Sequence, residues 1–174
     1  LTVIVGSGSA TYTVQVVEGD LPTIRVEVAQ KAFIGKEITA TVYLDNNPGL
    51  VSVKLAIDYD TTKLELIKAE AGEGFAGDDM FYGPLTAPFN ANWINALNPN
   101  NTNSGVFVTL TFKVKDDAVE GPTPITVRYD DDDLFNYDFE PVLFNTVNAE
   151  TEVRKCLPGD LNNDGKINIR DLGL

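Results

Sequence analysis

The sequence predicts an all-β fold, an antiparallel β-sandwich of about nine strands. Hydrophobic and polar residues alternate along residues 23–28, 51–59 and 106–114, which is the period-two pattern of strands with one buried face. Clusters of Asn, Pro, Gly and Asp separate such runs at intervals of roughly 8–15 residues, a spacing that favours a sandwich over alternating strands and helices. No amphipathic helical pattern precedes residue 165.

The N-terminal residues predict a separate hairpin. Strands are expected at Thr2–Val5 and Thr11–Val17, around a turn at Gly6–Ser9. A two-stranded hairpin alone is marginal in water, so this one is either the end of a preceding module or an addition to the sandwich. The chain begins at Leu1 without a signal peptide, and we therefore expect it to be a piece of a longer protein.

The composition disfavours several functions. The 174 residues include 13 basic and 26 acidic side chains, for a net charge of −13. This charge disfavours binding to nucleic acid and to anionic membranes, and no apolar run approaches the ~20 residues of a membrane span. The chain has no histidine, which removes Ser-His and Cys-His nucleophiles. Glu65, Glu70 and Glu73 show no pairing typical of a glycosidase, so we expect no enzyme activity.

A twelve-residue stretch near the C-terminus, Asp160–Asp171, has the spacing of an EF-hand-type calcium loop. Oxygen-bearing side chains stand at positions 1, 3, 5, 9 and 12, and Gly165 at position 6 permits the sharp turn. The alternative is a polar turn with accidental spacing. Asp closes the loop where sensor loops have Glu. The predicted Ca²⁺ ligands are Asp160, Asn162, Asp164, the main-chain carbonyl of Lys166, Asn168 and Asp171.

A run of four aspartates, Asp130–Asp133, leaves two interpretations open. It is either a second calcium site or a solvated loop at the end of a strand. The expected organisation of the chain is a hairpin at 1–20, the sandwich at 21–153, a linker at 154–159 and the calcium loop at 160–174.

The calcium loop, with its closing Asp171 and the sequence Ile-Arg-Asp-Leu at 169–172, resembles the first calcium repeat of a dockerin. A dockerin has two such repeats, whereas the resemblance covers only residues 159–174. The resemblance implies that a completed dockerin would bind a further cohesin.

Residues 22–153 resemble a cohesin of a cellulosome-type scaffoldin. The resemblance rests on residues 49–60, on Leu-Glu-Leu at 64–66, on residues 105–114 and on a closing strand at 147–153. It implies a nine-stranded jelly-roll sandwich without catalysis, one sheet face of which binds a dockerin. It also implies a secreted bacterial protein, extracellular or associated with the cell surface.

Alternation predicts which side chains face a partner. Along 51–59 the apolar set points inward, and along 106–114 the same rule places Phe107 outside as an aromatic anchor. The alternative for Phe107 is simple exposure or cover by a loop. The stretch 89–96 has an ambiguous pattern, so Trp93 is either core or contact. The predicted partner-binding residues are Ser52, Lys54, Ala56, Asp58, Asn92, Phe107, Thr109 and Thr111.

We therefore expect a non-catalytic module that binds a dockerin and assembles a polysaccharide-degrading complex. The alternative is a carbohydrate-binding sandwich in a dockerin-bearing protein. A row of outward aromatic side chains would favour the alternative, whereas small and hydroxyl side chains favour a protein partner.

Overall fold

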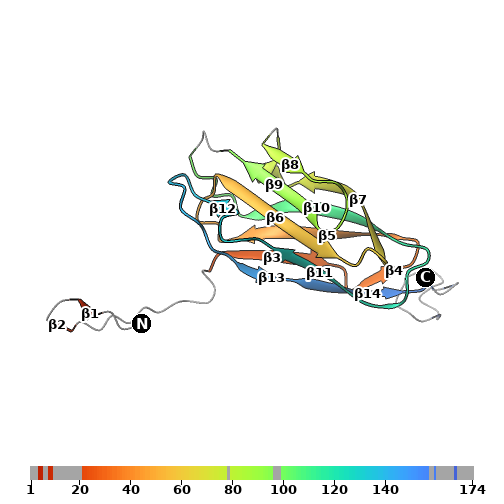
Figure 1. Cartoon of the computed structure of the whole chain (residues 1–174). Helices are drawn as coiled ribbons and strands as arrows, with labels where there is room; N and C mark the ends of the chain where they lie inside the picture. The colour runs from red at the N-terminus through yellow and green to blue at the C-terminus, as the bar shows by residue number, and fades with distance from the viewer. Residues whose placement is uncertain are drawn as a thin grey trace, which may run out of the picture.

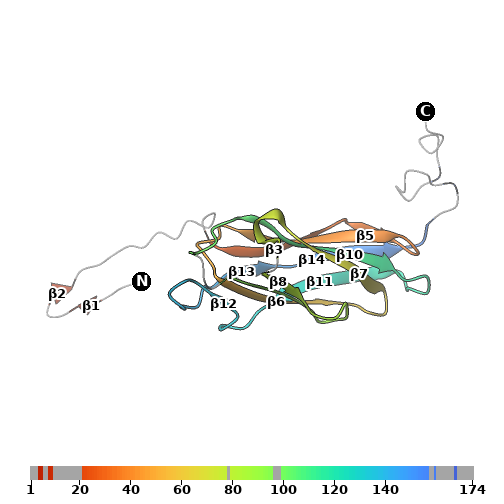
Figure 2. The ribbon, with the colours of Figure 1, turned by 90° about the horizontal axis from the view of Figure 1, so that it is seen from above.

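The computed structural model describes residues 21–77, 79–95 and 99–156, residues 159 and 167, and the backbone of 4–5 and 8–9. Two sheets pack face to face (Figure 1), and Figure 2 shows them as two layers. The predicted sandwich is confirmed. Among the described residues, no helix has both the length and the apolar character needed to cross a bilayer.

The first sheet has the strand order β13-β3-β5-β10-β7. Its bounds are Thr23–Val28 for β3, Glu37–Asp45 for β5, Leu64–Ala71 for β7, Gly105–Val114 for β10 and Asn145–Val147 for β13. A 3-10 turn, η2, spans Glu73–Phe75 after β7.

The second sheet has the order β4-β14-β11-β6-β9-β8, and β12 also pairs with β6. Several of these strands have only two or three residues, which is why the strands outnumber those expected from the sequence. The bounds are Lys31–Phe33 for β4, Ser52–Tyr59 for β6, Met80–Tyr82 for β8, Phe89–Ile94 for β9, Gly121–Arg128 for β11, Leu134–Phe135 for β12 and Ala149–Arg154 for β14.

Two strand pairings depart from the antiparallel prediction. β13 runs parallel to β3, and β14 runs parallel to β4. Because β13 starts beside the beginning of β3 and leads into β14, β3 begins at one end of the sandwich and β14 ends at the other (Figure 1).

The N-terminal hairpin differs from its prediction. β1 (Ile4–Val5) pairs antiparallel with β2 (Gly8–Ser9). The second strand therefore falls within the stretch where the sequence predicts the turn. The predicted strand Thr11–Val17 lies outside the described residues.

The core lies between the two sheets and is built from the inward side chains of both. On β6 the alternation holds as predicted, with Val53, Leu55 and Ile57 buried. Aromatic rings fill one part of the core: Phe75 of η2 meets Trp93 and Phe107 edge-on, with centroid distances of 5.4 and 5.1 Å. Trp93 is thus a core residue, the first of its two predicted alternatives.

The prediction for Phe107 is wrong. Its side chain is 0% exposed, because β10 carries a β-bulge: Val106 lies opposite Tyr43 and Val108 opposite Val42, so Phe107 is the extra residue. Phe107 and Val108 are consequently both buried in succession, and Val106 turns to the outer side with Tyr43.

Glycines surround this bulge. A Cβ on Gly72 would lie 1.7 Å from the carbonyl oxygen of Val106, and the Gly72 N–H donates to the Phe107 carbonyl at 2.9 Å. Gly105 adopts a φ of 127°, which favours glycine. The close approach of the chain after β7 therefore accompanies the bend of β10.

Candidate partner-binding face

The outer side of the second sheet, called here the β6 face, brings together five of the predicted partner-binding residues. Ser52, Lys54, Ala56 and Asp58 alternate with the buried residues of β6. Asn92 of β9 lies directly opposite Lys54. Opposite residues of paired strands point to the same side, so these five side chains share one surface.

The other predicted residues do not join them. Thr109 and Thr111 lie on β10, which belongs to the first sheet, so they face the opposite side of the sandwich. Phe107 is in the core. The eight predicted residues therefore do not share one sheet face. Alternation indicates whether a side chain points inward or outward, but it does not indicate in which sheet the strand lies.

Neighbouring strands complete the β6 face. From β9 come Asn90 and Ile94, opposite Ala56 and Ser52. Phe81 of β8 lies opposite Asn92. Beyond the other edge of β6, Thr126 and Arg128 of β11 lie opposite Asp58 and Ala56.

Two exposed hydrophobic side chains of this face were missed by the sequence analysis. Phe81 is 54% exposed and Ile94 50% exposed, and they lie diagonally across β8 and β9, since Asn92 is opposite Phe81. β8 has only three residues, too few for alternation to be visible. On β9, Phe89, Ala91 and Trp93 are buried, so Ile94 points outward. The sequence did not predict this, because residues 89–96 show no clear alternation of apolar and polar side chains.

Ion pairs occupy the other edge of the β6 face. Lys54 Nζ lies 2.6 Å from Asp133 Oδ1, and this hydrogen bond raises the pKa of Lys54. Burial works to raise the pKa of Asp133, but hydrogen bonds from Lys54 and from the Asp130 N–H outweigh it and lower that pKa. Arg128 Nε lies 2.8 Å from Asp58 Oδ2, which raises the pKa of Arg128.

These contacts bear on the aspartate run. The Asp133 carboxylate accepts hydrogen bonds from Lys54 and from the backbone of Asp130, which closes the loop on itself. Within the described part of the chain, no group of three or more Asp, Glu or Cys side chains is arranged to hold a metal ion. The hydrogen bonds of Asp133 therefore favour the loop interpretation of Asp130–Asp133.

The aromatic side chains of the β6 face do not form a row. Phe135 of β12 lies opposite Ser52 and is half-buried, whereas Phe81 lies on β8. β6 and β9 separate the two rings. The arrangement that the sugar-binding alternative requires is therefore not formed by these two residues.

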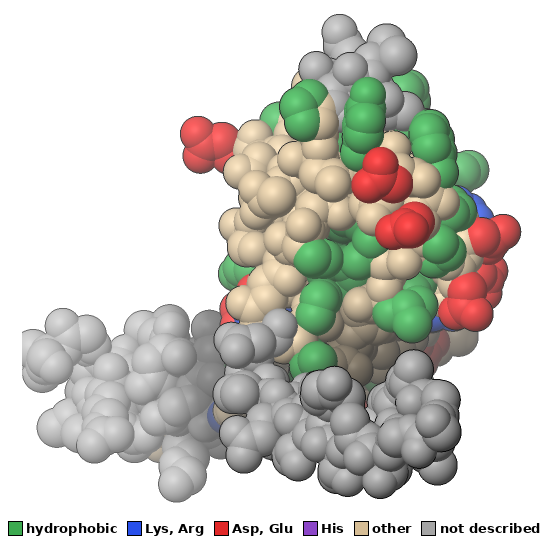
Figure 3. All heavy atoms as spheres, turned by 90° about the vertical axis from the view of Figure 1, so that its left-hand side faces the viewer, with side chains coloured by type: hydrophobic (Ala, Val, Ile, Leu, Met, Phe, Trp, Pro, Cys, Tyr) green, Lys and Arg blue, Asp and Glu red, His purple; other side chains and the backbone are tan. Residues whose placement is uncertain are grey.

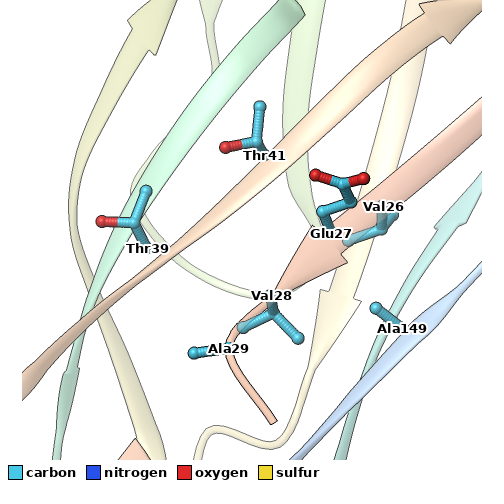
Figure 4. A pocket seen from close by; sticks show the side chains of 7 residues that line it. All are labelled: Val26, Glu27, Val28, Ala29, Thr39, Thr41 and Ala149. Atoms are coloured by element: carbon cyan, nitrogen blue, oxygen red, sulfur yellow. The ribbon is translucent and has the colours of Figure 1, made fainter.

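The outer side of the first sheet, called here the β10 face, has a different character. Thr109 and Thr111 lie opposite Thr41 and Thr39 of β5, which makes a patch of four hydroxyl side chains. A hollow of about 460 Å³ lies beside this patch, where β3 ends. Figure 4 shows the side chains that line it. Its lining residues are Val26, Glu27, Val28, Ala29, Thr39, Thr41 and Ala149.

The predicted calcium ligands cannot be placed on either face. Asp160, Asn162, Asp164, Lys166, Asn168 and Asp171 lie outside the described residues. The calcium loop and the dockerin resemblance therefore stay predictions.

The fold defines a class, the two-sheet β-sandwich module. The chain belongs to the cohesin domain family, whose model matches residues 22–133. Cohesin domains are non-catalytic interaction modules, so the chain is not an enzyme.

A curated relative is cellulose-binding protein A of Clostridium cellulovorans. The two sequences are 26% identical over 101 residues, which is 54% of this chain. The match spans only 5% of the length of that protein.

Solved structures share the fold at low sequence identity. The cohesin–dockerin type I complex Coh-OlpC-Doc435 from Clostridium thermocellum matches with a TM-score of 0.68 and 19% identity, covering 83% of this chain and 100% of that chain. The sixth cohesin of scaffoldin B from Acetivibrio cellulolyticus, in complex with a dockerin, matches with a TM-score of 0.66 and 17% identity. This match covers 76% of this chain and 99% of that chain. A non-cellulosomal cohesin from the archaeon Archaeoglobus fulgidus matches with a TM-score of 0.66 and 16% identity. This match covers 83% of this chain and 99% of that chain.

Proposed function

We propose that this cohesin binds a dockerin through its β6 face. The observation that carries the proposal is the exposed pair Phe81 and Ile94 at the edge of a sheet surface whose other side chains are mostly polar. Dockerin complexes of structurally similar cohesins support the choice of partner.

The β6 face has short side chains at its centre, apolar ones at one edge and ion pairs at the other. Ser52, Ala56 and Asn90 are short, so a helical surface can approach the strands closely along the centre of the face. Phe81 and Ile94 then bury apolar area at one edge, and a few such anchors carry most of the binding energy of an interface. At the opposite edge, Lys54 and Arg128 lie in ion pairs that set orientation more than affinity.

The test is capture of a panel of dockerins, followed by calorimetry with the best binder. We expect Phe81→Ala and Ile94→Ala each to weaken binding about tenfold or more, as hot-spot truncations do. Phe139→Ala and Ile67→Ala are matched controls, since both residues are exposed hydrophobics: Ile67 lies on β7 of the first sheet and Phe139 in the segment between β12 and β13. No capture by any dockerin, or equal losses in the controls, would refute the proposal.

We propose in the same way that the module serves a scaffold of a polysaccharide-degrading complex outside the cell. The similarity to cellulose-binding protein A supports this wider setting. The setting is tested by locating the native protein with an antibody in cell and culture fractions, where retention inside the cell would contradict it.

The sequence alone supports a further part of the proposal: Asp160–Asp171 binds Ca²⁺ as a dockerin repeat, and the dockerin to which it belongs binds another cohesin. We expect the double variant Asp160→Ala, Asp164→Ala to lose calcium binding in a titration calorimeter, because two oxygen ligands are removed. The matched control is Asp131→Ala, Asp132→Ala in the other acidic segment. Calcium binding that survives in the first variant and disappears in the control would contradict the proposal, because it would place the ion at Asp130–Asp133.

A further inference from the structure

One end of the sandwich carries hydrophobic side chains that the proposed dockerin face does not use. They come from the segment between β12 and β13, where Tyr137 is 52% and Phe139 71% exposed, and Leu143 is also exposed. Figure 3 looks at this end and shows apolar side chains gathered there with acidic ones among them. Residues 136–140, called here the aromatic tip, combine two exposed aromatic rings with two acidic side chains.

Hydrogen bonds within the aromatic tip fix the course of its backbone. The Asn136 Oδ1 accepts from the N–H groups of Asp138 and Glu140 at 3.0 and 2.9 Å. The Phe139 N–H donates to the Asn136 carbonyl at 3.0 Å. Phe139 has a φ of 60°, which is uncommon for a bulky residue and persists where the surroundings enforce it. The backbone of the tip therefore has little conformational freedom left to lose on binding.

A hollow of about 520 Å³ adjoins the tip and is lined by Pro99, Asn100, Tyr137 and Asp138. The Tyr137 N–H donates to Asn100 Oδ1 at 2.6 Å, which joins the two loops that form the hollow. Because this bond uses Oδ1, Asn100 offers a ligand its amide N–H donors, while Asp138 offers carboxylate acceptors. An aromatic ring, a donor and an acceptor thus line one concave surface.

We propose that this hollow is a binding site for a neutral oligosaccharide, separate from dockerin binding. A sugar ring has an apolar C–H face that suits the electron-rich face of Tyr137, and hydroxyl groups around its rim that suit Asn100 and Asp138. Asp138, Glu140 and the net charge of −13 repel acidic sugars, so the ligand is neutral.

The experiment is native electrophoresis of the full chain in gels that contain hydroxyethylcellulose, glucomannan or xylan, with polygalacturonate as the acidic comparison. We expect at least one neutral polysaccharide to retard the protein and polygalacturonate not to. Tyr137→Ala should weaken retention about tenfold, whereas Phe81→Ala on the β6 face should leave it unchanged. Dockerin capture should show the reverse pattern, so failure of one proposal is distinguishable from failure of the other.

Urea unfolding of each variant separates lost binding from lost structure, and Tyr137→Phe, which keeps the ring, should retain most of the retardation. Wild-type mobility that is unaffected by all three neutral polysaccharides overturns the proposal. So does a Tyr137→Ala protein that is retarded like the wild type, or one that loses dockerin capture instead, since the tip would then dock a protein.

Discussion

β6 and β10 have similar alternating sequences but different structures. On β6 the alternation runs unbroken, so each second side chain, from Ser52 to Asp58, reaches the β6 face. On β10 the bulge between Val106 and Val108 shifts the pattern, and Phe107 enters the core. The two strands also lie in different sheets.

The difference shows what alternation can and cannot establish. A period of two predicts correctly which sheet face a side chain occupies where strand pairing is regular. At a bulge the prediction fails, because one extra residue moves the neighbouring side chains to the other face. The bulge is accompanied by the contact of Gly72 with Val106, two residues far apart in sequence. A pattern within one strand carries no information about such a contact.

The largest effect that would sharpen this comparison concerns stability. Phe107→Ala should lower the free energy of unfolding by about 3–5 kcal/mol, because the ring is fully buried against Phe75. Phe81→Ala, an equal truncation on an exposed ring, should change it by no more than about 0.5 kcal/mol. Urea denaturation followed by tryptophan fluorescence measures both. An unchanged midpoint for Phe107→Ala would mean that the ring is not buried in the core.

A smaller effect separates the two faces by binding. Ala56→Lys places a long charged side chain at the centre of the β6 face and should weaken dockerin binding about tenfold or more, through lost close approach. Thr109→Lys makes a comparable change on the β10 face and should leave affinity within about twofold. Calorimetry with one dockerin measures both variants. Loss of affinity in Thr109→Lys alone would move the partner site to the first sheet.

The smallest effect concerns pH and the edge of the β6 face. The pKa of Asp133 is lowered in the folded protein, so its stabilising contribution is complete above about pH 4, the ordinary Asp range, and is lost as pH falls through the lower folded value. Asp133→Asn should reduce stability by about 1 kcal/mol at neutral pH. The difference from wild type should shrink in acid, as urea titrations at several pH values can measure. A difference that grows in acid would contradict this sign.

The sequence was sufficient for the sandwich, for the interior of β6 and for five members of the β6 face. It was insufficient for Phe81, because a strand as short as β8 has no visible period. It also could not place Thr109 and Thr111, since sheet membership follows from strand pairing and not from local pattern.

The positions of the first and last strands have a mechanical consequence. Since β3 begins at one end of the sandwich and β14 ends at the other (Figure 1), the backbone traverses the long dimension of the module. The β6 face lies along the flank of that path. A dockerin bound to the β6 face, as proposed, would lie beside this path. Tension applied between the two ends of the backbone would then not act directly on the contact with the dockerin.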